Sequence, residues 1–153
     1  MAKKLLKSKQ DSTVSPKEMN IKLLLEVMAV FNLLTGLLLI LIPAFLPKIV
    51  LDISETDSAF FAMSRVTGTA ILSIGIICWM VRRDGKSNAG KGIVTGFAIY
   101  NSLMMMVVVY AITIQDLSSP GLWAIVLIHS LLAGWCIRTA INMKIVFKYQ
   151  KLF

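Results

Sequence analysis

The sequence predicts an all-α membrane protein, an antiparallel bundle of four transmembrane helices with both termini in the cytoplasm. Three observations lead to this prediction. Hydrophobic residues make up 57% of the 153-residue chain, and a mean hydropathy of +0.78 lies far above the range of soluble proteins. Four apolar stretches reach the roughly 20 residues that a helix needs to cross a bilayer. Basic residues gather at both ends of the chain and in the middle connection.

The four predicted spans cover residues 23–46, 59–81, 93–114 and 122–143. The short alternating segments of a transmembrane barrel are missing from the sequence, so helices are the structure that satisfies the backbone in lipid. The later connections are short and rich in turn residues, namely RRDGKSNAGKG and QDLSSPG. Short connections predict antiparallel neighbours. The chain divides into a tail over 1–22, a transmembrane domain over 23–143 and a second tail over 144–153.

Positive charge is distributed unevenly between the two sides of the predicted bundle. The residues that carry it on one side are Lys3, Lys4, Lys7, Lys9, Lys17, Lys22, Arg82, Arg83, Lys86, Lys91, Lys144, Lys148 and Lys151. The other two connections contain only Lys48, beside several acidic residues. The positive-inside rule therefore places both tails and the middle connection in the cytoplasm. This orientation, together with anionic lipids at the cytoplasmic face, explains the net charge of +8 without a nucleic-acid partner.

The first external connection, PAFLPKIVLDISETDS, stays apolar between its prolines and its acidic group. We expect it to lie along the outer interface of the membrane.

Polar residues inside the predicted spans are the main functional candidates, because a polar side chain in lipid is costly. Counting about 1.5 Å per residue from the external ends places Arg65 roughly 10 Å deep. His129 and Tyr110 fall in about the same layer, so these three residues form a candidate ligand site. Helical side chains lean toward the helix N-terminus, so Arg65 is expected to reach the outer surface. There it would pair with a loop carboxylate or bind an anionic lipid or substrate group; the candidate carboxylates are Asp52, Glu55, Asp57 and Asp116.

Glu26 and Arg138 lie at similar depth near the cytoplasmic side and carry opposite charges. They are therefore candidates for an ion pair between the first and fourth spans. Lys22 competes, because it lies four residues before Glu26 on the same helix face.

Other polar and small residues suggest helix packing. Asn32 and Asn101 can form hydrogen bonds between helices. Ser64 with Gly68, and Ser130 with Gly134, are four residues apart and form stripes that allow close helix contact, within the chain or in a dimer.

No constellation of catalytic or metal-binding residues is apparent in the sequence. His129 has no acidic residue three or four positions later, and no cysteine lies at metal-ligand spacing. Cys78 and Cys136 form no C-x-x-C motif. Three consecutive methionines, 104–106, point about 100° apart on a helix and favour packing. We therefore predict no catalytic residue, no metal and no cofactor.

Two segments carry a family resemblance: GLLLILIPAFLPKIVLD, which ends the first span, and SRVTGTAILSIG, which opens the second. This pattern is similar to that of small DoxX-like membrane proteins, and the matching positions are Gly36, Pro43, Arg65 and Gly68. The resemblance covers about half of the chain. It implies a four-helix fold and a bacterial inner membrane, and it implies no specific activity.

Three functions follow as hypotheses. The first is a non-catalytic subunit or accessory protein that assembles with itself or with a larger membrane complex. The second is a small proton-coupled transporter that uses Glu26, since LLLEVMAVFN resembles the first-helix glutamate region of small multidrug resistance transporters. The third is a lipid- or quinone-interacting protein with its site near Arg65, His129 and Tyr110.

Overall fold

The computed structural model describes residues 16–51 and 57–150, and these residues form five helices and no strand. The helices are α2 (Pro16–Leu41), α3 (Phe45–Leu51), α4 (Ser58–Val81), α5 (Asn88–Ile114) and α6 (Pro120–Gln150). Side chains are described over 19–51 and 57–143. Four helices are long and apolar enough to cross a membrane, over Met19–Leu41, Ser58–Val81, Asn88–Ile114 and Pro120–Met143. The chain is therefore a helical, multi-pass membrane protein, while its orientation in the membrane stays a prediction.

The first span is shorter at its C-terminal end than predicted. α2 ends at Leu41, rather than at residue 46. Pro43 follows closely, and a proline lacks the N–H that would continue the helix. The chain then turns and begins α3 at Phe45. The apolar connection predicted to lie along the outer interface thus contains a helix of its own.

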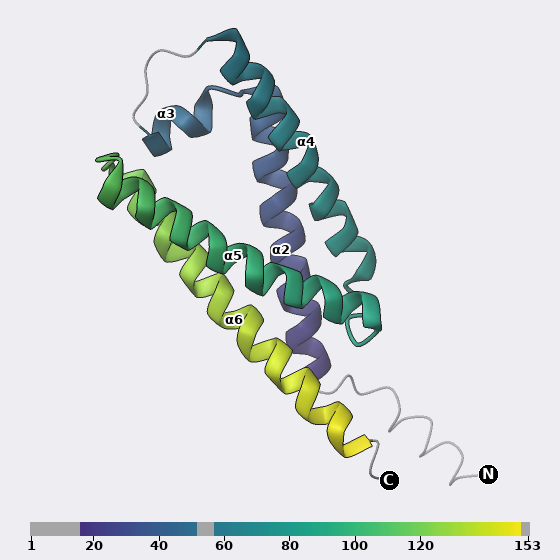
Figure 1. Ribbon diagram of the computed structural model, residues 1–153. Helices are drawn as coiled ribbons and strands as arrows, with labels where there is room; N and C mark the ends of the chain where they lie inside the picture. The colour runs from purple at the N-terminus through teal and green to yellow at the C-terminus, as the bar shows by residue number, and fades with distance from the viewer. Residues whose placement is uncertain (1–15, 52–56, 151–153) are drawn as a thin grey trace, which may run out of the picture.

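The long helices are arranged as two pairs (Figure 1). α2 packs along α4, and α5 packs along α6, with much less contact between the pairs. At the end of the molecule where α2 begins, the pairs share an apolar core. It includes Leu25 and Met28 from α2, Cys78 from α4, Phe97 from α5 and Cys136 from α6. Toward the other end the pairs diverge in Figure 1, and α3 lies between them.

The α2/α4 pair is held by direct contact between backbones. A Cβ atom on Gly36 would lie 2.7 Å from the carbonyl oxygen of Gly68, and a Cβ on Gly68 would lie 2.8 Å from that of Gly36. Ser64 is buried on the same helix as Gly68. The predicted small-residue stripe on the second span therefore packs within the chain, and its partner on α2 is Gly36.

α3 docks on the start of α6. The Ser119 hydroxyl donates to the carbonyl of Val50 and accepts a hydrogen bond from the Leu122 N–H at 3.2 Å. A Cβ on Gly121 would meet the Val50 Cα at 2.6 Å, so glycine is required for this close approach. These contacts place α3 across the wider end of the space between the two helix pairs.

Candidate functional site

A cavity of about 550 Å³ lies between the two helix pairs, on the side that α3 covers. All five helices contribute to its wall. Most of the lining is apolar, including Met28, Phe31, Leu46, Val50, Ile71, Met104, Val108, Ile125 and Leu132. The polar side chains in the described part of the wall are few and come from α2, α5 and α6: Asn32, Thr35, Tyr100, Asn101 and His129. A concave, mostly apolar wall with a few polar groups is typical of a small-molecule site.

The polar centre of this wall is a hydrogen bond between α5 and α6. The Asn101 Oδ1 atom lies 2.7 Å from His129 Nδ1, and Asn101 is 1% exposed. The Asn101 amide nitrogen donates to the Phe97 carbonyl at 2.7 Å, which directs Oδ1 toward the histidine. Because an amide oxygen only accepts, Nδ1 of His129 carries the proton. In the neutral ring, Nε2 is then left as an acceptor, and it makes no hydrogen bond within the described residues.

Two further polar side chains, those of Tyr100 and Asn32, line the same cavity. The Tyr100 ring contacts the His129 ring edge to face, with centroids 6.0 Å apart. Its hydroxyl has no hydrogen-bond partner in the described part of the chain, so it is available as a donor or an acceptor. Asn32, from α2, donates to the Met28 carbonyl of its own helix at 2.7 Å. Of the two amides predicted to bond between helices, Asn101 does so and Asn32 does not.

The predicted site of Arg65, His129 and Tyr110 does not form as one cluster. His129 lines the cavity, but neither Arg65 nor Tyr110 does. Tyr110 is 55% exposed on α5, and Arg65 is exposed on α4. Equal depth brings residues into one layer, but the rotation of each helix decides which side of that layer a side chain occupies.

Arg65 forms no ion pair within the described residues. Of its predicted partners, Asp57 caps α4 by accepting from the Phe60 N–H at 2.7 Å. Asp116 takes a positive φ of 57° in the α5–α6 connection. Asp52 and Glu55 lie outside the described residues, so pairing of Arg65 with either of them stays a prediction.

The ion pair predicted between Glu26 and Arg138 is not formed. Glu26 Oε1 lies 3.7 Å from Lys22 Nζ and 3.6 Å from Arg82 Nε, while Arg138 is exposed and has no ion pair among the residues described. Lys22, the local competitor, is therefore one of the actual partners. Arg82 is the other, because the turn after α4 returns the chain to the start of α2.

The second predicted small-residue stripe behaves differently from the first. The Ser130 hydroxyl contacts Met105 Sδ on α5 at 3.1 Å and donates to the Val126 carbonyl at 2.6 Å. Gly134 is exposed, and a Cβ there would have nothing within 4 Å. Ser130 thus contributes to the α5/α6 contact, whereas Gly134 makes no close helix contact within the described chain, and a dimer contact there stays a prediction.

The two cysteines are buried and free, and both belong to the shared apolar core. Within the described ranges, no three His, Cys, Asp or Glu side chains form a group that could hold a metal ion.

Sequence reasoning missed Tyr100 and Arg82 as site residues. Tyr100 directly precedes Asn101 in the sequence and lies on the same helical turn, so its proximity to a buried amide was the available signal. For Arg82, the available signal was its position three residues after Trp79, a spacing that allows the two side chains to touch on a helix. Its guanidinium carbon stacks 3.7 Å from the Trp79 ring, and Nη1 donates to the Trp79 carbonyl. That contact directs Arg82 back along α4 and toward Glu26.

Comparisons of this chain with protein-family models, with curated proteins and with solved structures found no match. The similarity to DoxX-like proteins therefore stays a prediction, and the function has to be argued from the geometry of the cavity.

Proposed function

We propose that this multi-pass membrane protein has a non-catalytic binding role, and that its ligand is a lipid-like or quinone-type molecule held between the two helix pairs. The observation that carries this proposal is the composition of the cavity wall. A largely apolar space of about 550 Å³ has in its wall the Asn101–His129 hydrogen bond, with the Tyr100 ring in contact with His129. Such a wall suits a molecule with a large apolar part and one small polar head.

The hydrogen-bonding groups indicate the chemistry of that head. His129 Nε2 can accept a hydrogen bond, since Nδ1 is occupied by Asn101. The Tyr100 hydroxyl can donate or accept. A hydroxyl group on the ligand can donate to His129 Nε2 and accept from Tyr100, so a quinol or a lipid hydroxyl can bond to both residues, whereas a quinone carbonyl can accept from Tyr100 alone. Among the residues that the structure describes, the wall contains no Asp, Glu, Lys or Arg side chain, which favours an uncharged head.

A thermal unfolding experiment on the purified protein in detergent tests this proposal. The probes are decylubiquinone and its quinol, with decane as the control that lacks a polar head. At 100 times its dissociation constant, a bound probe stabilises the folded state by about 2.7 kcal/mol. We expect decylubiquinone and its quinol to raise the midpoint temperature of unfolding and decane to leave it unchanged.

A variant that fills the cavity, together with a matched variant outside it, tests where the probe binds. Ala124 is exposed and lines the cavity, whereas Ala70 is exposed on α4 and does not line it. We expect Ala124→Phe to abolish the stabilisation and Ala70→Phe to retain it. Stabilisation that persists in Ala124→Phe would place the probe elsewhere and contradict the proposal.

The transporter hypothesis depends on Glu26, whose surroundings do not favour it. The Glu26 carboxylate lies beside two cations and does not line the cavity. Proton flux in liposomes that is lost on Glu26→Gln would support transport over the binding role. A role as an accessory subunit is compatible with a bound lipid or quinone, and stoichiometric partners recovered in a gentle detergent would support it.

A further inference from the structure

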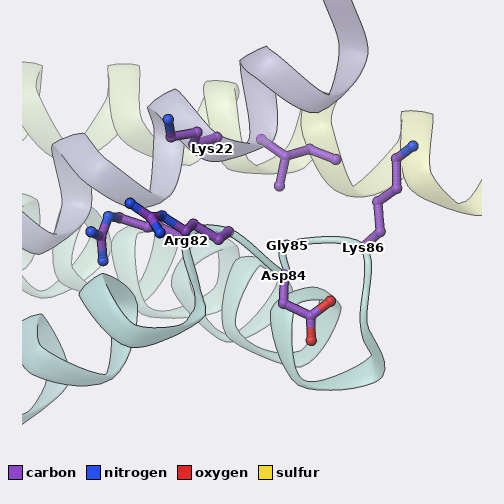
Figure 2. A pocket seen from close by; sticks show the side chains of 7 residues that line it. Lys22, Arg82, Asp84, Gly85 and Lys86 are labelled. Atoms are coloured by element: carbon purple, nitrogen blue, oxygen red, sulfur yellow. The ribbon is translucent and has the colours of Figure 1, made fainter. Parts of the chain in front are cut away.

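A second pocket, of about 530 Å³, lies at the end of the molecule where α2 begins (Figure 2). Ile21 and Lys22 of α2 form one side, and the turn over residues 82–86, between α4 and α5, forms the other. This basic pocket is separate from the cavity described above, because the two share no lining residue.

The basic pocket carries an excess of positive charge. The cations in its described lining are Lys22, Arg82, Arg83 and Lys86. Within the described side chains, the lining contains a single carboxylate, that of Asp84, which Figure 2 shows directed away from Lys22 and from Lys86. Glu26 lies between Lys22 and Arg82, and its one negative charge does not balance their two positive charges. The region therefore favours an anion.

Arg82 is held in place before any ligand arrives. Its side chain is 17% exposed, stacks on Trp79, donates to the Trp79 carbonyl and pairs with Glu26. A guanidinium has five N–H donors, and these contacts leave others unused. Because its rotamer is already fixed, Arg82 loses little entropy when it binds an oxyanion such as a phosphate.

The position of the basic pocket indicates where the anion comes from. Lys22 lies three residues after Met19, where the first candidate span begins, and Arg82 directly follows Val81, where the second ends. The pocket is thus at the level of the lipid head groups. Trp79 and Met80 are exposed beside it, and an interfacial tryptophan is typical of this depth.

We propose that the basic pocket binds the phosphate group of an anionic phospholipid. Lys22, Arg82 and Arg83 supply the charge, and the exposed apolar residues of α4 contact the acyl chains. This site distinguishes one lipid class at one position, which goes beyond a general attraction of cationic ends to an anionic membrane.

Native mass spectrometry of the full-length protein in detergent tests the proposal. The protein is equilibrated with equal amounts of phosphatidylglycerol and phosphatidylcholine, and the fraction with one bound lipid of each class is measured. We expect phosphatidylglycerol to predominate. Each surface cation contributes about fivefold to binding of an anionic lipid, so the double variant Lys22→Gln with Arg83→Gln should lose about 25-fold in phosphatidylglycerol binding.

The matched control is Lys48→Gln with Arg138→Gln, which removes the same charge from exposed positions outside the basic pocket. We expect this control to keep the preference for phosphatidylglycerol. Equal binding of the two lipids by the unmodified protein would overturn the proposal, and so would an equal loss in both double variants. Release of the lipid by millimolar inorganic phosphate would support a phosphate site and assign it to a soluble phosphate compound instead.

Discussion

The two helix pairs of this molecule are held together in different ways. In the α2/α4 pair, the backbones touch at Gly36 and Gly68, with a Cβ on either residue excluded by the other's carbonyl oxygen. In the α5/α6 pair, side chains bridge the gap: Asn101 bonds to His129, and Ser130 contacts Met105. Gly134 on α6 takes no part in a close contact.

The difference shows how association can be achieved without a hydrophobic driving force between helices. Lipid chains are as apolar as leucine, so membrane helices associate through close packing or through interhelical hydrogen bonds. Close packing at Gly36 and Gly68 leaves no room for a side chain between α2 and α4 at that point. Bonding through Asn101 and His129 leaves polar atoms beside a cavity. Both pairs line the cavity, and the α5/α6 pair supplies the hydrogen bond at its polar centre.

The largest effect is expected where the backbones touch. In Gly36→Ala, the new methyl group would lie 2.6 Å from the Leu72 nitrogen and 2.7 Å from the Gly68 oxygen. Neither backbone atom can move without separating the helices. We expect the free energy of unfolding to fall by about 3 kcal/mol, the upper part of the usual range for overpacking. Titration with sodium dodecyl sulfate in mixed micelles measures this change.

Gly134→Ala is the matched control in the other pair. The added methyl group meets no atom within 4 Å, and alanine favours a helix over glycine by up to ~1 kcal/mol. Stability should stay constant or increase slightly. A loss in Gly134→Ala as large as in Gly36→Ala would remove the distinction between the two pairs.

A smaller effect is expected at Ser119, which joins α3 to the α5/α6 pair. Its hydroxyl caps the first turn of α6 at Leu122 and bonds to the Val50 carbonyl. Ser119→Ala removes both contacts and should lower the free energy of unfolding by about 1–2 kcal/mol. In the same titration, Ser118→Ala serves as the control, because Ser118 is exposed. Equal losses in both variants would show that α3 is not docked through Ser119.

The hydrogen bond between Asn101 and His129 is expected to contribute less. Interhelical hydrogen bonds in membrane proteins average about 0.6 kcal/mol, with a maximum near 1.7 kcal/mol. A double-mutant cycle of Asn101→Leu and His129→Leu should give a coupling free energy in this range. The parallel cycle of Asn32→Leu and His129→Leu should give none, because Asn32 bonds within its own helix. Equal coupling in the two cycles would contradict the assignment of Asn101 as the partner of His129.

The four long helices could be predicted from the sequence because hydropathy and span length are properties of each segment alone. The residue at which α2 ends was harder to predict. The apolar run continues to residue 46, yet Pro43 interrupts the helix, and α3 then begins at Phe45. Apolar composition does not separate a span from an apolar segment that folds back over the bundle. The signal was the pair of prolines at 43 and 47.

The candidate site was harder to predict because it depends on which helix faces meet. Asn101 lies 13 residues before Ile114, and His129 lies nine residues after Pro120. Counted from the connection between α5 and α6, the two residues differ in depth by four residues, or about 6 Å. Their side chains nevertheless meet at 2.7 Å. Residue counts give the approximate depth of each side chain. Contacts between side chains also depend on how each helix is rotated and how two helices cross, and neither can be counted along one sequence.

The smallest effect on stability is expected at Arg65 of α4. This residue tests whether charge, in addition to close packing, stabilises the α2/α4 pair. It is exposed, and in the described part of the chain no carboxylate pairs with it. If Asp52 or Glu55 is its partner, the pair is an exposed one, and exposed pairs contribute weakly because water and side-chain entropy oppose them. Cycles of Arg65→Gln with Asp52→Asn and with Glu55→Gln should give a coupling of about 0.5 kcal/mol in one of the two. No coupling in either cycle would contradict the predicted anchor. It would also leave close packing at Gly36 and Gly68, not charge, as the main interaction that positions α4.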